Sequence, residues 1–464
     1  MTTENTAVPN KTSVISKIAI GKYNLPNILN GIGIRFVNGC NKVAYSFSRA
    51  ALALNAGQLN YLHNARVMEN CKNAIAKIIH PRYKKITTQL LDIKSWCIQQ
   101  HQPYTVVPTQ QTIDIKRPQL IDPPSDVTHT GHGIAHLPEA YLAELHQTTI
   151  IAGSNLILTN ANQIILNDEI YADQDRRYSF KSQYVVHADK NTITVKYIKQ
   201  MPQPIAKGIH FCHDFSHNYY HWILECLPRL YVVDQFADIN NLPLLVDDGL
   251  TQQQLDALKL MNTANHPLHF LHKGHSYQVN QLFVPNMSTV IHDNYNSPVA
   301  YDKDVLISPT AIHYMREKIL QKLGCANQKG FRKIFISRKQ SEHRRLLNLP
   351  EIENLLMSRG FEIVFPEALT FANQVKLFAQ AELVVGQTGA GFVNLMWCPE
   401  NCKALFMINH NVQTSYYLFS VLTDILNIDL KFIPGTDIIE PENKGLQNDF
   451  VISIDTLNKT LDTI

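Results

Sequence analysis

A run of polar and aromatic residues around position 220 has the residue types and the spacing of an acid–base site. His217, His221 and Glu225 follow one another at intervals of four residues. On a helix capped near Ser216 they share one face, so the Glu225 carboxylate can orient the His221 imidazole one turn away. An imidazole titrates near neutral pH and is therefore suited to take a proton from an attacking hydroxyl. The pattern predicts a general base at His221.

Two other interpretations of these histidines stay open. His221 can instead fill a hydrogen bond in the core beside Trp222. The spacing of His213, His217 and His221 also permits metal coordination. Because the sequence shows no matching set of acidic ligands, we expect no metal and no other cofactor.

A second polar segment, 336–348, follows a strand-like run and contains Arg338, Arg344 and Arg345. The planar guanidinium group binds phosphate through two parallel hydrogen bonds. These arginines can therefore neutralise the diphosphate of a leaving nucleotide, a task that a metal performs in other enzymes. A solvated loop without a ligand is the alternative interpretation.

The third candidate is the glycine turn at 386–394, which lies between a strand-like run and a helix-like one. Gly389 and Gly391 can adopt positive φ and let a ligand approach the backbone, and the N–H groups of the following helix favour an anion. A tight turn without a ligand is equally consistent with glycine here. The arginine segment and the glycine turn follow strands of the same predicted sheet, so we expect both at one sheet edge.

The elements that would position these residues alternate between strand and helix, which indicates parallel sheet. The alternation runs from about 205 to 285 and again from 309 to 408, with helices at 309–323, 349–358, 371–380 and 390–396. Two Rossmann-like halves are predicted. Ligands bind such sheets at the carboxyl ends of their strands, so the working surface should be a cleft between the halves.

The chain before position 205 is organised differently. Apolar spacing predicts helices at 41–57, at 58–79 and from Pro81 to about Gln100. Five prolines between 103 and 126 predict a linker, or a strap over the next domain. Short runs rich in Ile, Val and Thr at 148–200 predict antiparallel strands.

Composition limits the class of protein. Residues 1–100 hold 13 Lys and Arg against 3 Asp and Glu, whereas the other 364 residues hold 29 against 36. The basic region could contact an anionic membrane surface or be a solvated helical face, and the absence of any reader module argues against nucleic acid. Eight dispersed cysteines and no signal-peptide or membrane-spanning pattern favour a cytoplasmic protein, with peripheral attachment at the inner face of the membrane as a further expectation.

Taken together, the motifs resemble glycosyltransferase family 61. The resemblance lies in the string Asn218–Leu230, in Ile336-Ser-Arg338 with Arg345 and Asn348, in Phe365-Pro-Glu367, and in Gly389-Ala-Gly391 with Asn394. It spans roughly 130–410 and leaves out the first hundred residues. Relatives often carry His immediately before Gly-Ala-Gly, where this chain has Thr388.

The resemblance implies an α/β protein of GT-B-like architecture, with two Rossmann-like domains facing a cleft. The apolar spacing described above adds an extra helical N-terminal region. It implies inverting transfer, without a metal, from a nucleotide sugar to a glycan acceptor, of the type found in bacterial capsular polysaccharide synthesis. Carried over by position, Asn218, His221 and Glu225 are the catalytic residues on the acceptor side. The predicted donor-binding residues are Arg338, Arg345, Asn348, Glu367, Thr388, Gly389, Ala390, Gly391 and Asn394.

The expected domains are a basic region at 1–102, an acceptor-side domain at 125–308, a nucleotide-sugar domain at 309–410 and a tail at 411–464 that crosses back. The first region is expected to dock on a membrane surface or on capsule machinery. Replacement of the family histidine by Thr388 keeps an alternative open, a catalytically silent nucleotide- or glycan-binding component of a capsule assembly complex. An NAD-dependent oxidoreductase is disfavoured, because the glycine spacing reverses the dinucleotide fingerprint.

Overall fold

The computed structural model describes residues 83–464 and two short strands, β1 (Ala19–Ile20) and β2 (Tyr23–Asn24). Within 83–464 it leaves out 126, 128–130, 160–163, 180–181, 200–203, 287, 293–294, 340–342, 411–413 and 439–446. The chain divides into two compact units, Met1–Arg82 and Tyr83–Ile464. The helices predicted at 41–57 and 58–79 lie outside the described residues, as does most of the basic region.

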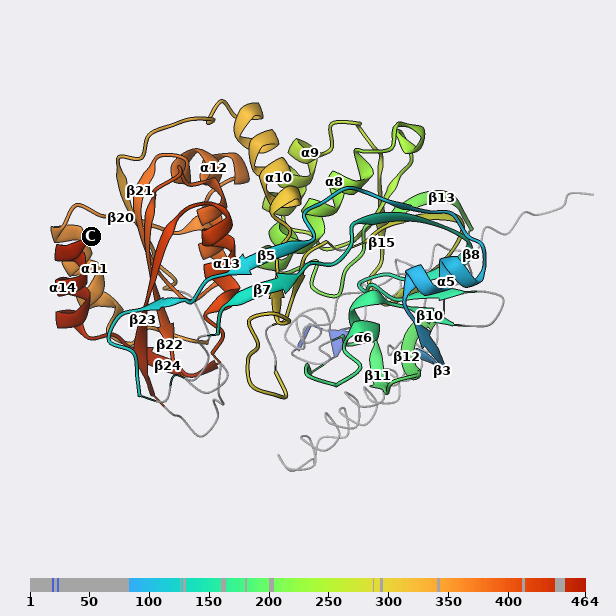
Figure 1. Cartoon of the computed structure of the whole chain (residues 1–464), viewed down its shortest axis with the longest axis horizontal. Coiled ribbons are helices and arrows are strands. Elements are labelled where there is room, and N and C mark those ends of the chain that lie inside the picture. Colours follow the sequence, from blue (N-terminus) through green and yellow to red (C-terminus); the bar gives the residue numbers. More distant parts are fainter. Residues whose placement is uncertain are drawn as a thin grey trace, which may run out of the picture. The chain divides into compact units, whose positions relative to one another are not determined.

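The first sheet of the second unit mixes antiparallel and parallel strands (Figure 1). From one edge to the other its strands are β11 (Val185–Ala188), β12 (Thr192–Lys199), β3 (Tyr83–Leu91), β10 (Ile165–Leu166), β9 (Ile157–Thr159), β8 (Tyr141–Ile151), β16 (His275–Pro285), β13 (Ile205–His210), β14 (Leu244–Asp247) and β15 (Leu268–Leu271). The last four run parallel to one another. The antiparallel strands predicted at 148–200 and the alternation predicted after 205 are therefore both present.

The helix predicted from Pro81 to about Gln100 is wrong over its first half. Residues Tyr83–Leu91 form strand β3, and α5 (Ile93–Gln99) begins only after the N-cap Asp92. The β-branched run from Ile86 to Thr88 suits a pleated strand, and β3 pairs antiparallel with β12 over seven positions. That partner lies about a hundred residues further along the chain, so local periodicity could not reveal it.

The proline-rich segment 103–126 is a strap, as one of the two interpretations predicted. Its strand β4 (Tyr104–Val106) pairs with β8 in the first sheet, and β6 (Gln119–Leu120) pairs with β23 in the second. Between them, β5 (Thr112–Ile115) pairs with β7 (Gly133–His136). The strap thus links the two sheets.

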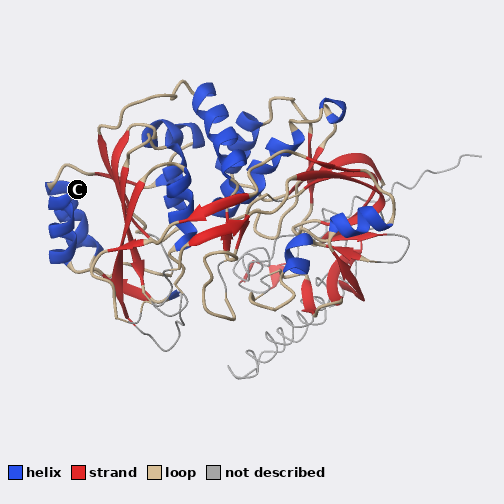
Figure 2. Ribbon diagram, in the orientation of Figure 1, coloured by secondary structure: helices blue, strands red, loops and turns tan. Residues whose placement is uncertain are grey.

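The second sheet contains β20 (Glu362–Val364), β19 (Arg332–Ile336), β21 (Ala381–Gln387), β22 (Lys403–Asn409), β23 (Asp429–Ile438) and β24 (Asp449–Val451), in that order. All are parallel except β24. Helices cover both faces, with α11 (Leu349–Ser358) and α14 (Ile454–Thr463) on one side and α12 (Phe371–Phe378) and α13 (Tyr417–Ile425) on the other (Figure 2). The stretch after residue 411 therefore adds two strands and two helices around this sheet.

A continuous hydrophobic core joins the two sheets. One buried cluster includes Phe211 and Trp222 from the first half together with Val384, Phe392 and Phe406 from the second. Helices α9 (Gln252–Met261) and α10 (Pro309–Lys322) lie between the halves, and α9 contacts both α10 and α12. The fold is mixed α/β, as the sequence predicted. None of the helices within the described residues is long and apolar enough to cross a membrane.

Candidate functional site

The segment around His221 is helical, but its helix begins later and is wider than the sequence suggested. Helix α7 (Tyr219–His221) is capped by Asn218, whose side chain accepts a hydrogen bond from the Tyr220 N–H at 3.0 Å. Ser216 is therefore not the cap, and His217 lies before the helix. Residues Trp222–Cys226 continue as a π-helical turn, in which the Leu227 N–H reaches back to the Trp222 carbonyl. Such wide turns often occur at functional sites.

The π-helical turn holds His221 and Glu225 together. The imidazole Nδ1 of His221 is hydrogen-bonded to Oε2 of Glu225. The other carboxylate oxygen of Glu225 accepts the Ile291 N–H at 2.9 Å, which fixes the carboxylate against strand β17 (Val290–Ile291). The Glu225 carboxylate therefore fixes the orientation of the His221 ring through Nδ1.

Both members of the pair are buried, since the side chains of His221 and Glu225 are 3% and 2% exposed. The His221 ring stacks on Phe215 at a centroid distance of 4.8 Å and meets Tyr220 edge-on. The imidazole is thus held firmly in orientation.

The sequence interpretation missed several acidic residues in this part of the first half. Glu169, in α6 (Asp168–Ala172), has its pKa raised well above the usual range by burial first and by the nearby charges of Glu225 and Asp214. Burial likewise raises the pKa of Asp214 to about 6. Asp247, at the end of β14, accepts the backbone N–H groups of His213 and Gly153.

One of these carboxylates could have been found from sequence, and the others could not. Asp247 directly follows the apolar run of a parallel strand, and side chains in that position meet at the working edge of the sheet. Glu169 lies in a short helix outside any strand–helix repeat. Only non-local strand pairing brings it to Glu225.

The arginine segment and the glycine turn meet, as expected from their places after neighbouring strands β19 and β21. The Arg338 guanidinium donates a hydrogen bond to the Thr388 carbonyl, and Arg344 Nη1 lies 3.5 Å from the Thr388 hydroxyl. Burial, and then the neighbouring charge of Arg344, lower the pKa of Arg338 to about 10, while Glu367 opposes that shift. Two guanidinium groups are therefore held close to one backbone turn.

Gly389 has a different role from the one that the sequence suggested. Its φ is 166°, which is extended backbone, so no left-handed conformation calls for glycine here. A Cβ at this position would instead lie 2.7 Å from Cδ and Nε of Arg338. Glycine is therefore required by the close approach of the arginine. The helix predicted at 390–396 is a 3-10 helix that runs over Ala390–Trp397.

Two predicted donor residues are engaged elsewhere in the protein. Arg345 forms an ion pair with Asp449, with its Nε 2.8 Å from Oδ2. Asn348 exchanges hydrogen bonds with the backbone of Ile452 at 2.8 and 3.2 Å. Both contacts tie the arginine segment to β24. Their donor-binding roles stay predictions.

Asn394 links the two sides of the site. It is fully buried, and its Oδ1 lies 3.3 Å from the Tyr219 hydroxyl of α7. Its Nδ2 donates to Gln374 at 2.9 Å and to the Gly391 carbonyl at 3.0 Å. One amide thus connects the helix of His221 to the glycine turn, so the predicted constellations converge on one region.

The structure gives no support to metal coordination by the histidines. Across the described residues, no group of three or more His, Cys, Asp and Glu side chains is arranged to hold a metal ion. Burial lowers the pKa of His213 well below its usual range. Partial covering of the His217 ring, and then the charge of Lys273, also lower the pKa of that residue. Both imidazoles are accordingly neutral at physiological pH.

One protein-family model matches the part of the chain that contains these residues. The model of the family described as Glycosyltransferase 61 matches residues 219–405, a segment that begins in α7 and ends in β22. It includes His221, Glu225, the arginine segment and the glycine turn. A search of curated proteins finds no match to the chain.

Proposed function

We propose that this protein is an inverting glycosyltransferase that moves a hexosyl or pentosyl unit from a nucleotide sugar to a glycan acceptor. The match of residues 219–405 to the Glycosyltransferase 61 family model supports the proposal. The two sheets would form a GT-B-like pair, with the donor bound at the carboxyl edge of the second sheet. The acceptor belongs to capsular or other surface polysaccharide. No metal is required in this scheme.

The observation that carries the proposal is the convergence of Arg338 and Arg344 on the glycine turn. Two neighbouring guanidinium groups repel each other, and an anion bound between them relieves that repulsion. The diphosphate of a nucleotide is such an anion, and its negative charge increases as the sugar departs. Interactions that strengthen with that charge accelerate the transfer step.

The His221–Glu225 pair supplies the complementary half of the mechanism. As the acceptor oxygen attacks the anomeric carbon, the proton on that oxygen passes to Nε2 of His221. The resulting imidazolium is stabilised by the Glu225 carboxylate on Nδ1. Attack on the face opposite the departing diphosphate inverts the anomeric configuration.

A silent binding component remains the second candidate function. It is favoured by the 3% exposure of His221 and by Thr388 at the position where relatives carry histidine. In that case the arginines and the glycine turn would bind a nucleotide without turnover.

A two-part experiment separates these functions. Thermal-shift screening against UDP-, GDP-, CMP- and ADP-linked sugars should identify one donor, because a ligand bound only by the folded protein raises its melting temperature. That donor should then be consumed when glycan acceptors are supplied. Binding without consumption favours the silent component, and binding of no nucleotide sugar rejects both functions.

A further inference from the structure

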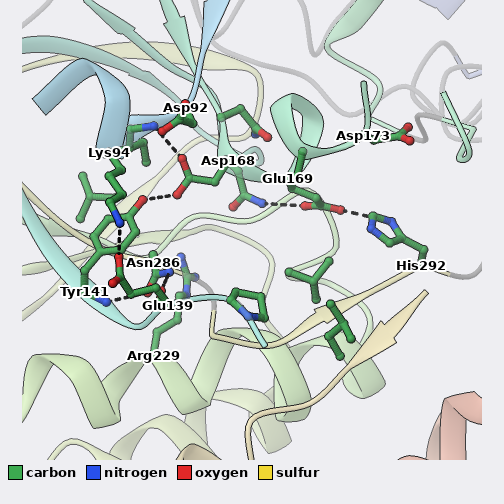
Figure 3. Close-up of a pocket in the computed structure, with 18 of the residues that line it drawn as sticks. Asp92, Lys94, Glu139, Tyr141, Asp168, Glu169, Asp173, Arg229, Asn286 and His292 are labelled. Carbon is green, nitrogen blue, oxygen red and sulfur yellow. Dashed lines mark hydrogen bonds and ion pairs between the residues drawn. The ribbon is translucent and has the colours of Figure 1, made fainter. Parts of the chain in front are cut away.

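A cavity of about 510 Å³ opens beside the first sheet, mostly outside the residues that match the family (Figure 3). Its walls come from α5, β8, α6 and the chain around β17, and none of its lining residues belongs to the arginine segment or the glycine turn. Small-molecule sites in proteins commonly have about 300–1,000 Å³. The cavity is therefore large enough for a sugar residue and part of its neighbour.

The charged side chains at one end of the cavity are already paired. Lys94 donates to Glu139 at 2.7 Å, and the Tyr104 hydroxyl shares the same carboxylate oxygen. Asp168 accepts the Ile93 N–H at 2.6 Å and is hydrogen-bonded to the Tyr141 hydroxyl, as Figure 3 shows. Burial raises the pKa of Asp168 to about 6. Lys94 is therefore already paired, and with a pKa of about 6 the Asp168 carboxyl is mostly ionised at neutral pH.

The buried cation of the cavity is also engaged. Arg229 is 2% exposed, and its guanidinium donates to the backbone carbonyls of Phe211, Cys212 and Cys226. Arg177, also at the wall, is paired with Asp304 at 3.1 Å. A carboxylate or phosphate on a ligand would have to displace these contacts.

The wall nearest the proposed base carries Glu169 and His292, which point toward one another (Figure 3). The Glu169 carboxyl accepts a hydrogen bond from Asn155 Nδ2 at 3.4 Å and lies 3.8 Å from His292 Nδ1. Glu225, the partner of His221, is bonded to the Ile291 N–H directly between the lining residues Val290 and His292. One strand therefore separates the cavity from the proposed base pair.

A buried histidine provides an independent indication of a ligand. His210 lines the cavity and is 2% exposed, and within the described residues its Nε2 has no hydrogen-bond partner. Burial lowers the pKa of His210 to about 3, so the ring is neutral. A buried polar atom without a partner is unfavourable, and a ligand hydroxyl or an ordered water can satisfy it.

We propose that this cavity binds an uncharged, hydroxyl-rich sugar residue of the acceptor glycan, with Glu169, Asp168 and His210 as its hydrogen-bonding groups. The assignment to the acceptor rests on the proposed transferase function. The Asp168 carboxylate accepts hydrogen bonds, whereas a protonated Glu169 carboxyl and the neutral His210 imidazole can each donate and accept, which matches the dual character of sugar hydroxyls. Apolar faces of the sugar would lie against Ile157, Val284 and Leu306.

The test uses a variant that narrows the cavity at its edge. Ala172 is exposed and lines the cavity, so Ala172→Trp reduces the space without altering the core. Ala237→Trp, at an exposed position of a short helix outside the cavity, is the matched control. Glu169→Gln, which keeps the side-chain shape, is the second variant.

Saturation-transfer NMR with methyl glycosides of glucose, galactose, xylose and N-acetylglucosamine measures sugar binding, with methyl glucuronide and glucosamine as charged probes.

We expect at least one neutral glycoside to bind the wild type more tightly than either charged probe. Ala172→Trp should weaken that binding by at least about tenfold, and Glu169→Gln by about three- to tenfold, whereas Ala237→Trp should leave it unchanged. Equal binding by Ala172→Trp and wild type, preference for a charged probe, or binding of no neutral glycoside overturns the proposal. Donor binding, measured separately by thermal shift, reports on the transferase function alone.

Discussion

The two sides of the site differ in the charges that they bring together. His221 and Glu225 form a closed hydrogen-bonded unit whose remaining oxygen is fixed by Ile291. Arg338 and Arg344 instead share one backbone turn, and their mutual repulsion contributes to the lowered pKa of Arg338. A preorganised base needs no further partner until the reaction occurs, whereas clustered cations are stabilised by a bound anion. On the His221 side the protein fixes the orientation of a side chain, whereas on the Arg338 side it gathers positive charge.

The largest effect is expected from removing the oriented base. His221→Ala should lower turnover by about 10²- to 10⁴-fold while leaving donor affinity unchanged, because general-base catalysis acts on the transition state. His313→Ala, at an exposed position of α10, is the matched control. Steady-state kinetics and a nucleotide titration give the two numbers. Full turnover in His221→Ala would assign the helix a structural role only.

Replacing an arginine of the cationic side should instead lower the affinity for the donor. Arg338→Ala should weaken donor binding by roughly 10- to 150-fold, corresponding to a charged hydrogen bond of about 1.5–3 kcal/mol. Arg332 lies at the other end of the same strand and is paired with Glu362, so Arg332→Ala is a matched control. Calorimetric titration with the nucleotide diphosphate measures both. Equal affinities in the two variants would remove the diphosphate from this turn.

The acidic surroundings of the base side predict a pH-dependent stability. Burial raises the pKa of Asp168 from 3.8 to about 6, so between these values the folded protein binds the proton more tightly than the unfolded chain. The free energy of unfolding should therefore fall as pH rises from about 4 to about 6, by about 2 kcal/mol for this group.

The variant Asp168→Asn isolates this contribution, since an amide can still accept from Ile93 and donate to Tyr141. Urea unfolding at pH 4 and pH 6 should show a smaller decline in the variant than in the wild type. Asp175→Asn, at an exposed position nearby, is the control. An unchanged decline in Asp168→Asn would contradict the raised pKa.

The smallest effect is expected from the glycine that makes room for Arg338. In Gly389→Ala the extended backbone tolerates the new side chain, but the added Cβ forces Arg338 from its rotamer. Donor affinity should fall by about two- to tenfold. Gly391→Ala should be milder, because its added Cβ meets nothing closer than 3.5 Å. A larger loss in Gly391→Ala than in Gly389→Ala would assign the turn a different role.

Sequence reasoning succeeded where local signals determine structure. Helix α11 has the bounds predicted for it, residues 349–358. It failed where partners are distant. Strand β3 depends on β12, and the Arg345–Asp449 pair joins residues 104 positions apart. Glu169 reaches Glu225 through such non-local pairing, so its neighbourhood could not be read from sequence.

The contrast between an oriented base and a cationic leaving-group site predicts a definite stereochemical outcome. With the donor identified by the thermal-shift screen, the anomeric proton coupling of the first-formed product can be followed by NMR. Opposite anomeric configuration in donor and product is expected, because the proposed mechanism has the acceptor attack the face opposite the departing diphosphate. A product that keeps the configuration of the donor would contradict the account.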